Sequence, residues 1–201
     1  MSRVVTISAS YGSGGSWVGP QVAERLGWRF IDRAIPVQVA ERLEVPVEHA
    51  HVHDEAAAPA FTRLLARLPN TSGVVVPEAT SPDFCRETER VLIEAAGAGE
   101  VVVLGRAGAI VLRDRPDTFH VRLDGPPEPR VLQGMRVEDV DEEEARRRQR
   151  TSDRARLDYV KHFYRADARD PRHYHLVLDS TAVPLATCVE VIVTAARAHG
   201  S

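Results

Sequence analysis

The feature that most constrains the fold is a short apolar run at residues 4–7, followed by a glycine- and serine-rich turn at residues 11–16. A short run of apolar and β-branched residues is typical of a strand that is buried on both faces of a parallel sheet. Beyond the turn, apolar residues recur at helical spacing from Val18 to Leu26, and Gly27 is a typical helix end. The chain therefore begins with a strand, a glycine turn and a helix.

The rest of the chain repeats this alternation of short strands and longer helices. Strands are predicted at residues 28–32, 101–104, 119–123 and 176–178, helices at 34–43, 56–68, 81–96 and 184–197, and a loop at 69–80. Strands separated by helices indicate a parallel α/β sheet, whose ligands bind beyond the carboxyl ends of the strands. The candidate site therefore contains the residues that follow the strands, which are the glycine turn, Asp32, Gly105, Arg106, Asp124 and Asp179.

A strongly charged segment near residue 141 is predicted to form a long helix that projects into solvent. Asp141 and Glu144 have the spacing of a capping box at its start. Opposite charges four residues apart meet on one helix face, and three such pairs follow the cap, namely Glu142/Arg146, Glu143/Arg147 and Glu144/Arg148.

Composition excludes several classes of protein. The length of 201 residues fits one domain, and a net charge of −3 argues against nucleic-acid binding. Two cysteines are too few for a disulfide scaffold or a thiolate zinc site. No apolar run is long enough to span a membrane and no signal peptide precedes the first strand, so we expect a cytoplasmic protein. Nothing in the sequence marks a dimer face, although a homodimer is compatible with it.

The glycine turn partly matches the P-loop pattern G-x-x-x-x-G-K-[ST], in which backbone amides and a lysine bind nucleotide phosphates. Ala9 stands at the first glycine position, Gly14 at the second, Gly15 at the lysine and Ser16 at the serine or threonine. The single lysine of the chain, Lys161, lies far from this turn. The alternative interpretation is an ordinary glycine-rich turn between a strand and a helix.

Five segments resemble those of a known family in the same order. They are ISASYGSGGS at residues 7–16, LGWRFID at 26–32, VLGRAGAI at 103–110, DRARLDYVKHFY at 153–164 and DPRHYHLVLDST at 170–181. Together they resemble the cytidylate kinase-like family, relatives of bacterial cytidylate kinases among the nucleoside monophosphate kinases. Within that family the G-S-G-G form of the loop is usual. The resemblance implies a three-layer α/β P-loop kinase domain over residues 1–201, with a parallel sheet, an acceptor-side helical insertion near 34–100 and a helical lid near 141–172.

The resemblance also implies roles for individual residues on the donor side. ATP would be the phosphoryl donor and Mg²⁺ its metal ion, with Ser16 bound to the metal or to a β-phosphate oxygen. The donor phosphates would be held by the backbone amides of Gly12, Ser13, Gly14 and Gly15.

On the acceptor side, Asp32 matches the catalytic-site carboxylate that ends the second strand, and Arg106 matches an arginine that grips the acceptor phosphate. The serine that follows Asp32 in cytidylate kinases is Arg33 here, which alters the expected cytidine pocket. The lid segment D-R-x-R and the segment D-P-R-x-Y supply the remaining candidates, which are Asp153, Arg154, Arg156, Asp170 and Arg172.

Phosphoryl transfer spreads negative charge over the transferred group, and the planar guanidinium of arginine suits its oxygens. Because the loop has no lysine, we expect Arg154 or Arg156 to stabilise this charge, with Lys161 as a further candidate. The predicted function is Mg²⁺-dependent transfer of the ATP γ-phosphoryl group to a small acceptor such as CMP or dCMP, without a nucleic-acid or membrane partner. The alternatives are a kinase for another small molecule and a non-catalytic nucleotide-binding or regulatory module.

Three histidines at alternate positions of one segment allow two interpretations, a metal site and a solvent-exposed tract. On a strand, His49, His51 and His53 would share one face and bind a metal ion, but no strand signal surrounds them, so we expect a solvent-exposed tract. The aromatic residues Tyr159 and Tyr164 are expected to pack the lid helix rather than to stack on a base.

Overall fold

The computed structural model describes residues 2–32 and 82–200. Its five-stranded sheet has the order β2-β3-β1-β4-β5, and every neighbouring pair of strands is parallel. The strands are β1 (Val4–Ala9), β2 (Arg29–Ile31), β3 (Val101–Leu104), β4 (Thr118–Asp124) and β5 (Leu176–Asp179). All five predicted strands and the parallel α/β fold are thus confirmed.

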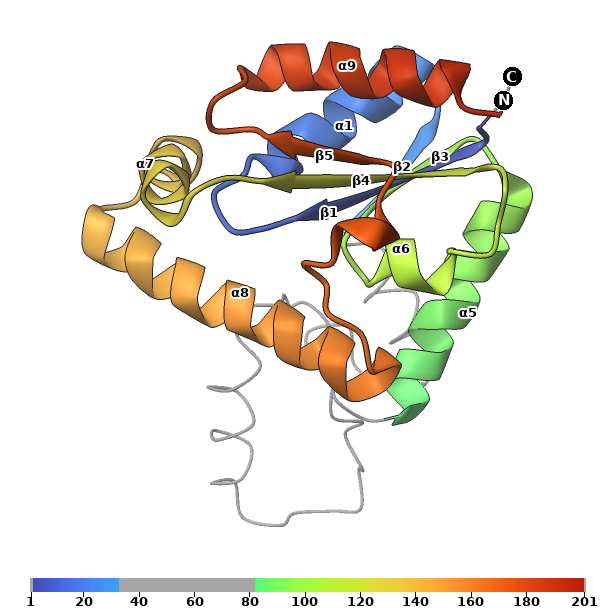
Figure 1. Cartoon of the computed structure of the whole chain (residues 1–201), viewed down its shortest axis with the longest axis horizontal. Coiled ribbons are helices and arrows are strands. Elements are labelled where there is room, and N and C mark those ends of the chain that lie inside the picture. The colour runs from blue at the N-terminus through green and yellow to red at the C-terminus, as the bar shows by residue number, and fades with distance from the viewer. Residues whose placement is uncertain (1, 33–81, 201) are drawn as a thin grey trace, which may run out of the picture.

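Helices cover both faces of the sheet, which gives three layers (Figure 1). They are α1 (Gly15–Leu26), α5 (Pro82–Ala98), α6 (Gly108–Val111), α7 (Pro127–Glu138), α8 (Glu142–Tyr164) and α9 (Leu185–Ala198), with a 3₁₀ turn at Pro171–His173. Helices α1 and α9 lie side by side over one face, and α5 and α6 lie on the other. The predicted end of α1 is confirmed, because Gly27 adopts the left-handed conformation (φ 72°) that closes the helix.

The two hydrophobic cores follow from the alternation of side chains along the strands. On β1, Val5 and Ile7 pack with α1 and α9, whereas Val4 packs on the opposite face with Leu92 of α5. Such burial on both faces accounts for the short apolar runs of β1 and β3. Within the described residues, no helix has the length and apolarity needed to cross a membrane.

Helix α8 is polar along most of its length, as predicted, but it bridges two parts of the fold. Its first half packs against α7, and its far end reaches α5 (Figure 1). There the hydroxyl oxygens of Tyr164 and Tyr159 lie 3.4 and 3.6 Å from Sγ of Cys85. The two tyrosines therefore pack between helices, in line with the expectation from the sequence.

The predicted ion pairs along α8 form with one change. Arg146 pairs with Glu142 and Arg148 with Glu144, at nitrogen–oxygen distances of 2.8 and 2.7 Å. Arg147 instead pairs with Glu144, three residues away, rather than with Glu143. Two arginines thus share the Glu144 carboxylate, and their hydrogen bonds lower its pKa to about 2.

Several predictions lie outside the described residues. They concern the helices at 34–43 and 56–68, the loop at 69–80, Ser81 at the start of α5, Arg33, and the tract of His49, His51 and His53. The boundaries of the insertion and of the lid stay predictions.

Three histidines stack at the end of the sheet where the strands begin. His120 on β4 is only 3% exposed, its Nδ1 lies 2.7 Å from Oγ1 of Thr6, and its ring stacks on His175. His175 in turn contacts His199, which follows α9. Burial and, secondly, the charge of His175 lower the pKa of His120 to about 4.

This low pKa predicts acid sensitivity of the fold. The unfolded chain takes up the His120 proton near pH 6.5 and the folded chain only near pH 4, so acid favours unfolding in this window. We expect the protonation of His120 to lower the free energy of unfolding by about 3 kcal/mol as the pH falls from about 7 to about 4. Urea unfolding of the wild type and of His120→Asn at both pH values measures this difference. An equally steep pH dependence in His120→Asn would refute it, and the exposed His162→Asn serves as the control.

Candidate functional site

The glycine turn connects the carboxyl end of β1 to the first residue of α1, as the sequence predicts. Gly12 and Gly14 have φ values of 72° and 76°, a left-handed conformation that glycine adopts without steric cost. A Cβ atom on Gly12 would lie 2.0 Å from the backbone oxygen of Arg130. Both the backbone conformation and the close approach of α7 therefore require glycine at position 12.

Four backbone amides of this loop are available to a ligand. No described residue accepts a hydrogen bond from the N–H groups of Gly12, Gly14, Gly15 or Ser16, and the Ser16 side chain is exposed. By contrast, Ser13 is buried, and both its N–H and its hydroxyl donate to the backbone oxygen of Ser10. Clustered amides in a turn and at a helix N-terminus favour anion binding.

The geometry around Gly15 explains why the loop has no lysine. A Cβ atom on Gly15 would lie 2.5 Å from Cβ of Ala9 and 3.2 Å from Cδ1 of Leu104. The methyl group of Ala9 thus occupies the space that any side chain at position 15 needs. The P-loop pattern has glycine at the position of residue 9 and lysine at that of residue 15. In this chain the side chain is at residue 9, an alanine, and the glycine is at residue 15.

Helix α7, which the sequence analysis missed, lies directly against the loop. Its Arg130 is 7% exposed and donates from Nε to the backbone oxygen of Gly125 (2.9 Å) and from Nη1 to that of Tyr11 (2.9 Å). Gln133, one turn further along, donates to the backbone oxygen of Gly12 at 2.9 Å. The signal for this helix was Pro127 at its first position followed by an acidic residue in its first turn.

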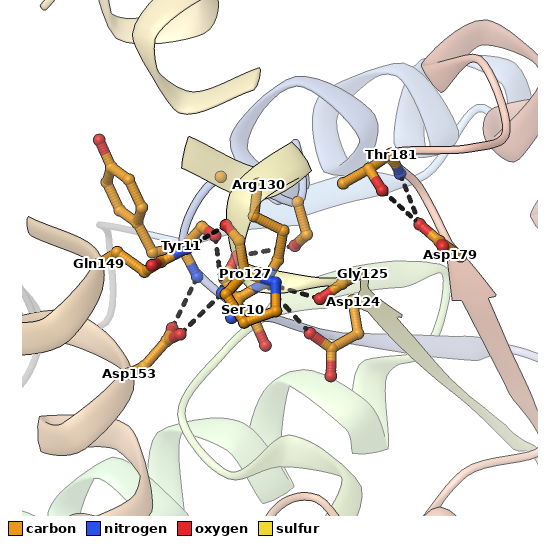
Figure 2. Close-up of polar contacts among 12 residues, drawn as sticks. Ser10, Tyr11, Asp124, Gly125, Pro127, Arg130, Gln149, Asp153, Asp179 and Thr181 are labelled. Carbon is orange, nitrogen blue, oxygen red and sulfur yellow. Dashed lines mark hydrogen bonds and ion pairs between the residues drawn. The ribbon is translucent and has the colours of Figure 1, made fainter. Parts of the chain in front are cut away.

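Asp153 on α8 completes these contacts (Figure 2). Its carboxylate accepts a hydrogen bond from the N–H of Tyr11 at 2.8 Å and one from Nη1 of Arg130 at 2.7 Å. The ring of Tyr11 points away from this pair and packs with Val131 and Ala145, and its hydroxyl donates to Glu138. Burial and, secondly, the Glu138 charge raise the pKa of Tyr11 to about 12.

A second arginine that was not predicted, Arg122 on β4, contacts Ser10 at the start of the loop. Its guanidinium donates to Asp124, to the hydroxyl of Ser10 (3.1 Å) and to the backbone oxygen of Ala168 (3.0 Å). Burial raises the pKa of Asp124, but the hydrogen bond and charge of Arg122 outweigh this effect and leave the pKa below its usual value. The alternation of polar and apolar residues along β4 was the available signal for Arg122.

The structure separates the two candidate arginines of α8. Arg154 has 85% of its side chain exposed and pairs with Asp158 at 3.5 Å. Arg156 is 33% exposed and has Nη1 3.8 Å from Oδ1 of Asp153. Residues three apart share a helix face, so Arg156 lies on the face of α8 that carries Asp153 towards the loop.

The other predicted residues lie at strand ends or on a more distant turn. Asp32 follows β2 and is half-buried. Arg106 follows β3 in a run of three left-handed residues, Gly105–Ala107, with φ values of 75°, 57° and 53°. Non-glycine residues in this conformation are strained, and such strain clusters at functional sites. Asp170 and Arg172 pair with each other near the 3₁₀ turn, where Asp170 also caps the N–H of Arg172.

A magnesium ion would find few protein ligands at this loop. No group of three or more potential ligand side chains occurs in the part of the chain that the structure describes. This fits Mg²⁺ in nucleotide sites, which takes most of its ligands from phosphates and water. The exposed Ser16 hydroxyl, next to the available amides, suits such an ion.

A cavity of about 290 Å³ lies elsewhere, beside the histidine stack. Arg115, His175 and His199 contribute to its lining. Arg115 is already paired with Asp117 at 2.9 Å. This cavity is at the amino end of the strands and does not belong to the loop site.

Comparisons with known proteins show which sequences and folds this chain is similar to. The model of the cytidylate kinase-like family matches residues 4–182. The cytidylate kinase of Methanopyrus kandleri is 34% identical over 109 residues, which are 50% of this chain and 56% of that enzyme. The chain therefore spans little more than half the length of this curated relative.

Solved structures share the fold at low sequence identity. An uncharacterized protein from Eubacterium ventriosum has a TM-score of 0.71 and 17% identity, over 96% of this chain and 98% of that one. A gluconokinase from Sinorhizobium meliloti has a TM-score of 0.53 and 16% identity, over 97% and 91% of the chains. A shikimate kinase from Bacteroides thetaiotaomicron has a TM-score of 0.51 and 14% identity, over 97% and 96%. The fold is thus the α/β P-loop fold that the sequence predicts.

Proposed function

Because this chain belongs to the cytidylate kinase-like family, we propose that it transfers the γ-phosphoryl group of ATP to a small acceptor, with CMP or dCMP the first candidates. The observation that carries the proposal is the loop between β1 and α1, whose amides at Gly12, Gly14, Gly15 and Ser16 are available to phosphates. The similarity to a cytidylate kinase over half of the chain supports the choice of acceptor.

In the proposed reaction, an acceptor phosphate oxygen attacks the γ-phosphorus of ATP. The new oxygen–phosphorus bond forms as the bond to the β–γ bridging oxygen breaks, and ADP leaves. The loop amides hold the donor phosphates, and Mg²⁺ bound to them would neutralise part of their charge. No general base is needed, because the acceptor oxygen is already an anion.

The chain's own residues position the acceptor and stabilise the transferred group. Arg106 at the end of β3 suits an acceptor phosphate, and Asp32 at the end of β2 suits the hydroxyl or amino groups of the acceptor. Arg156 on the inner face of α8 supplies the positive charge that a lysine supplies in other P-loops. Asp170 and Arg172 remain acceptor-side candidates.

A second candidate is a kinase for a different small molecule. Arg33 stands where the resemblance places a serine next to Asp32, and a guanidinium favours an acceptor with an additional anionic group. A non-catalytic nucleotide-binding module would bind ATP without turnover.

One assay separates these functions. ADP release from ATP and Mg²⁺ is measured with a panel of nucleoside monophosphates, shikimate, gluconate and no acceptor. We expect turnover that depends on CMP or dCMP. Turnover with another acceptor alone would support the second candidate, and tight ATP binding without turnover on any acceptor would refute the proposed phosphotransfer.

A further inference from the structure

Both backbone polar groups of Tyr11 are held by one ion pair, in which Arg130 is buried and Asp153 is half-buried. The N–H of Tyr11 donates to Oδ1 of Asp153 at 2.8 Å, and its carbonyl oxygen accepts from Nη1 of Arg130 at 2.9 Å. Asp153 and Arg130 also bond each other at 2.7 Å, which closes a ring of three hydrogen bonds (Figure 2). Tyr11 directly precedes Gly12, the first residue of the loop with an available amide.

We infer that Arg130 and Asp153 are positioning residues that hold the phosphate loop in its anion-binding conformation and couple it to helix α8. This inference rests on the proposed function, in which the loop binds the donor phosphates. The resemblance assigns Asp153 to the acceptor and transferred groups, whereas its contacts here are to the donor loop. Arg130 has no role assigned by the sequence analysis.

The printed contacts of Arg130 use Nε and Nη1, and all of them are to groups of the protein itself. Besides Tyr11 and Asp153 it donates from Nε to the backbone oxygen of Gly125, and the same nitrogen lies 3.6 Å from Asp124. Hydrogen bonds to charged groups are strong, and removal of Asp153 would leave the buried Arg130 guanidinium without its charged partner. Its guanidinium therefore fixes the backbone around the loop, and through that backbone it positions the amides that face the phosphates.

The pair also links the loop to the helix that carries Arg156. Asp153 and Arg156 are three residues apart on α8, and the Tyr11 ring packs between α7 and α8 against Val131 and Ala145. A displacement of α8 would thus move Asp153 and Arg156 together, and the hydrogen bond to Asp153 would transmit the displacement to the N–H of Tyr11. The loop conformation and the position of the lid arginine are coupled through Asp153.

The test combines amide exchange of Tyr11, measured by NMR without nucleotide, with the dissociation constant for Mg-ATP. We expect Asp153→Ala and Arg130→Ala each to speed Tyr11 exchange at least about tenfold and to raise the dissociation constant about tenfold or more, where tenfold equals about 1.4 kcal/mol. Asp153→Asn keeps an acceptor for the N–H, and Arg130→Lys keeps the charge, so both should restore part of the loss.

Arg146→Ala is the matched control, because Arg146 joins α8 to Glu128 of α7 at 2.9 Å without a contact to the loop. It should leave both measurements within about twofold of the wild type. If Arg130→Ala does not fold, the Asp153 variants decide the question.

The outcomes separate this inference from the proposed function. A wild type that binds no nucleotide refutes the proposed function, while Tyr11 exchange in the variants still decides whether the pair holds the loop. A wild type that binds Mg-ATP, with Asp153→Ala unchanged in exchange and affinity or no different from Arg146→Ala, overturns the inference.

Discussion

Replacement of Arg156 by alanine is expected to lower the single-turnover rate of phosphoryl transfer about 10³-fold, which equals about 4 kcal/mol of transition-state stabilisation. The loop offers backbone amides but no side-chain cation, so the charge that develops on the transferred group needs an arginine. Of the two arginines in the D-R-x-R segment, Arg156 lies on the face of α8 that carries Asp153, whereas Arg154 is 85% exposed. Rapid-quench measurement at saturating ATP and acceptor isolates this step.

Two variants on the same helix serve as controls. Arg154→Ala and Lys161→Ala are expected to lower the rate less than about tenfold, because both side chains are exposed. Arg156→Lys keeps the charge but loses the planar fork, so we expect partial activity. Losses below tenfold in all three alanine variants would refute the role of a lid cation.

Replacement of Gly15 by alanine is expected to destabilise the protein and to abolish tight nucleotide binding, although alanine normally favours a helix. The new Cβ would lie 2.5 Å from Cβ of Ala9, and overpacking of this kind costs about 1–3 kcal/mol. In an unconstrained helix the same change stabilises by up to about 1 kcal/mol. Because the clash shifts the loop amides, we expect the dissociation constant for Mg-ATP to rise by more than about tenfold.

The paired substitution provides the decisive control. Ala9→Gly removes the methyl group that occupies the space, so Ala9→Gly/Gly15→Ala should recover most of the stability and affinity that Gly15→Ala loses. Thermal unfolding and calorimetric titration with Mg-ATP are measured for the wild type, the two single variants and the double variant. These measurements give the coupling free energy between positions 9 and 15. Additive effects, with no recovery in the double variant, would show that Ala9 does not exclude a side chain at position 15.

The sequence predicted those parts of the fold that depend on local pattern. Buried parallel strands are short apolar runs, so β1 and β3 were recognisable, and Gly27 marked the end of α1 by its tolerance of positive φ. Gly12 and Gly14 were recognisable as part of the glycine-rich turn between the first strand and the first helix. The order of the strands was not predicted, since the pairing of parallel strands depends on long-range packing.

The contacts of the site were less predictable, because they join segments that are distant in sequence. Helix α7 begins at Pro127 directly after Gly125 and Pro126, and a glycine with two prolines by itself indicates a turn, so Arg130 was missed. Motif comparison treated Arg154 and Arg156 alike, and only the direction of α8 relative to the loop separates them. The exclusion of a lysine at position 15 by Ala9 became visible only as a distance between the strand and the helix.

The central claim is that the lysine-free loop binds the donor phosphates through its own backbone amides. The chain has 13 glycines, so selective ¹⁵N-glycine labelling gives a simple amide spectrum in which Gly12, Gly14 and Gly15 report on the loop. Titration with Mg-ATP should shift these three resonances in a saturable manner and leave Gly27 and Gly97, which lie in or at the ends of helices away from the loop, unchanged. A titration in which Mg-ATP leaves the three loop resonances unmoved would contradict the claim.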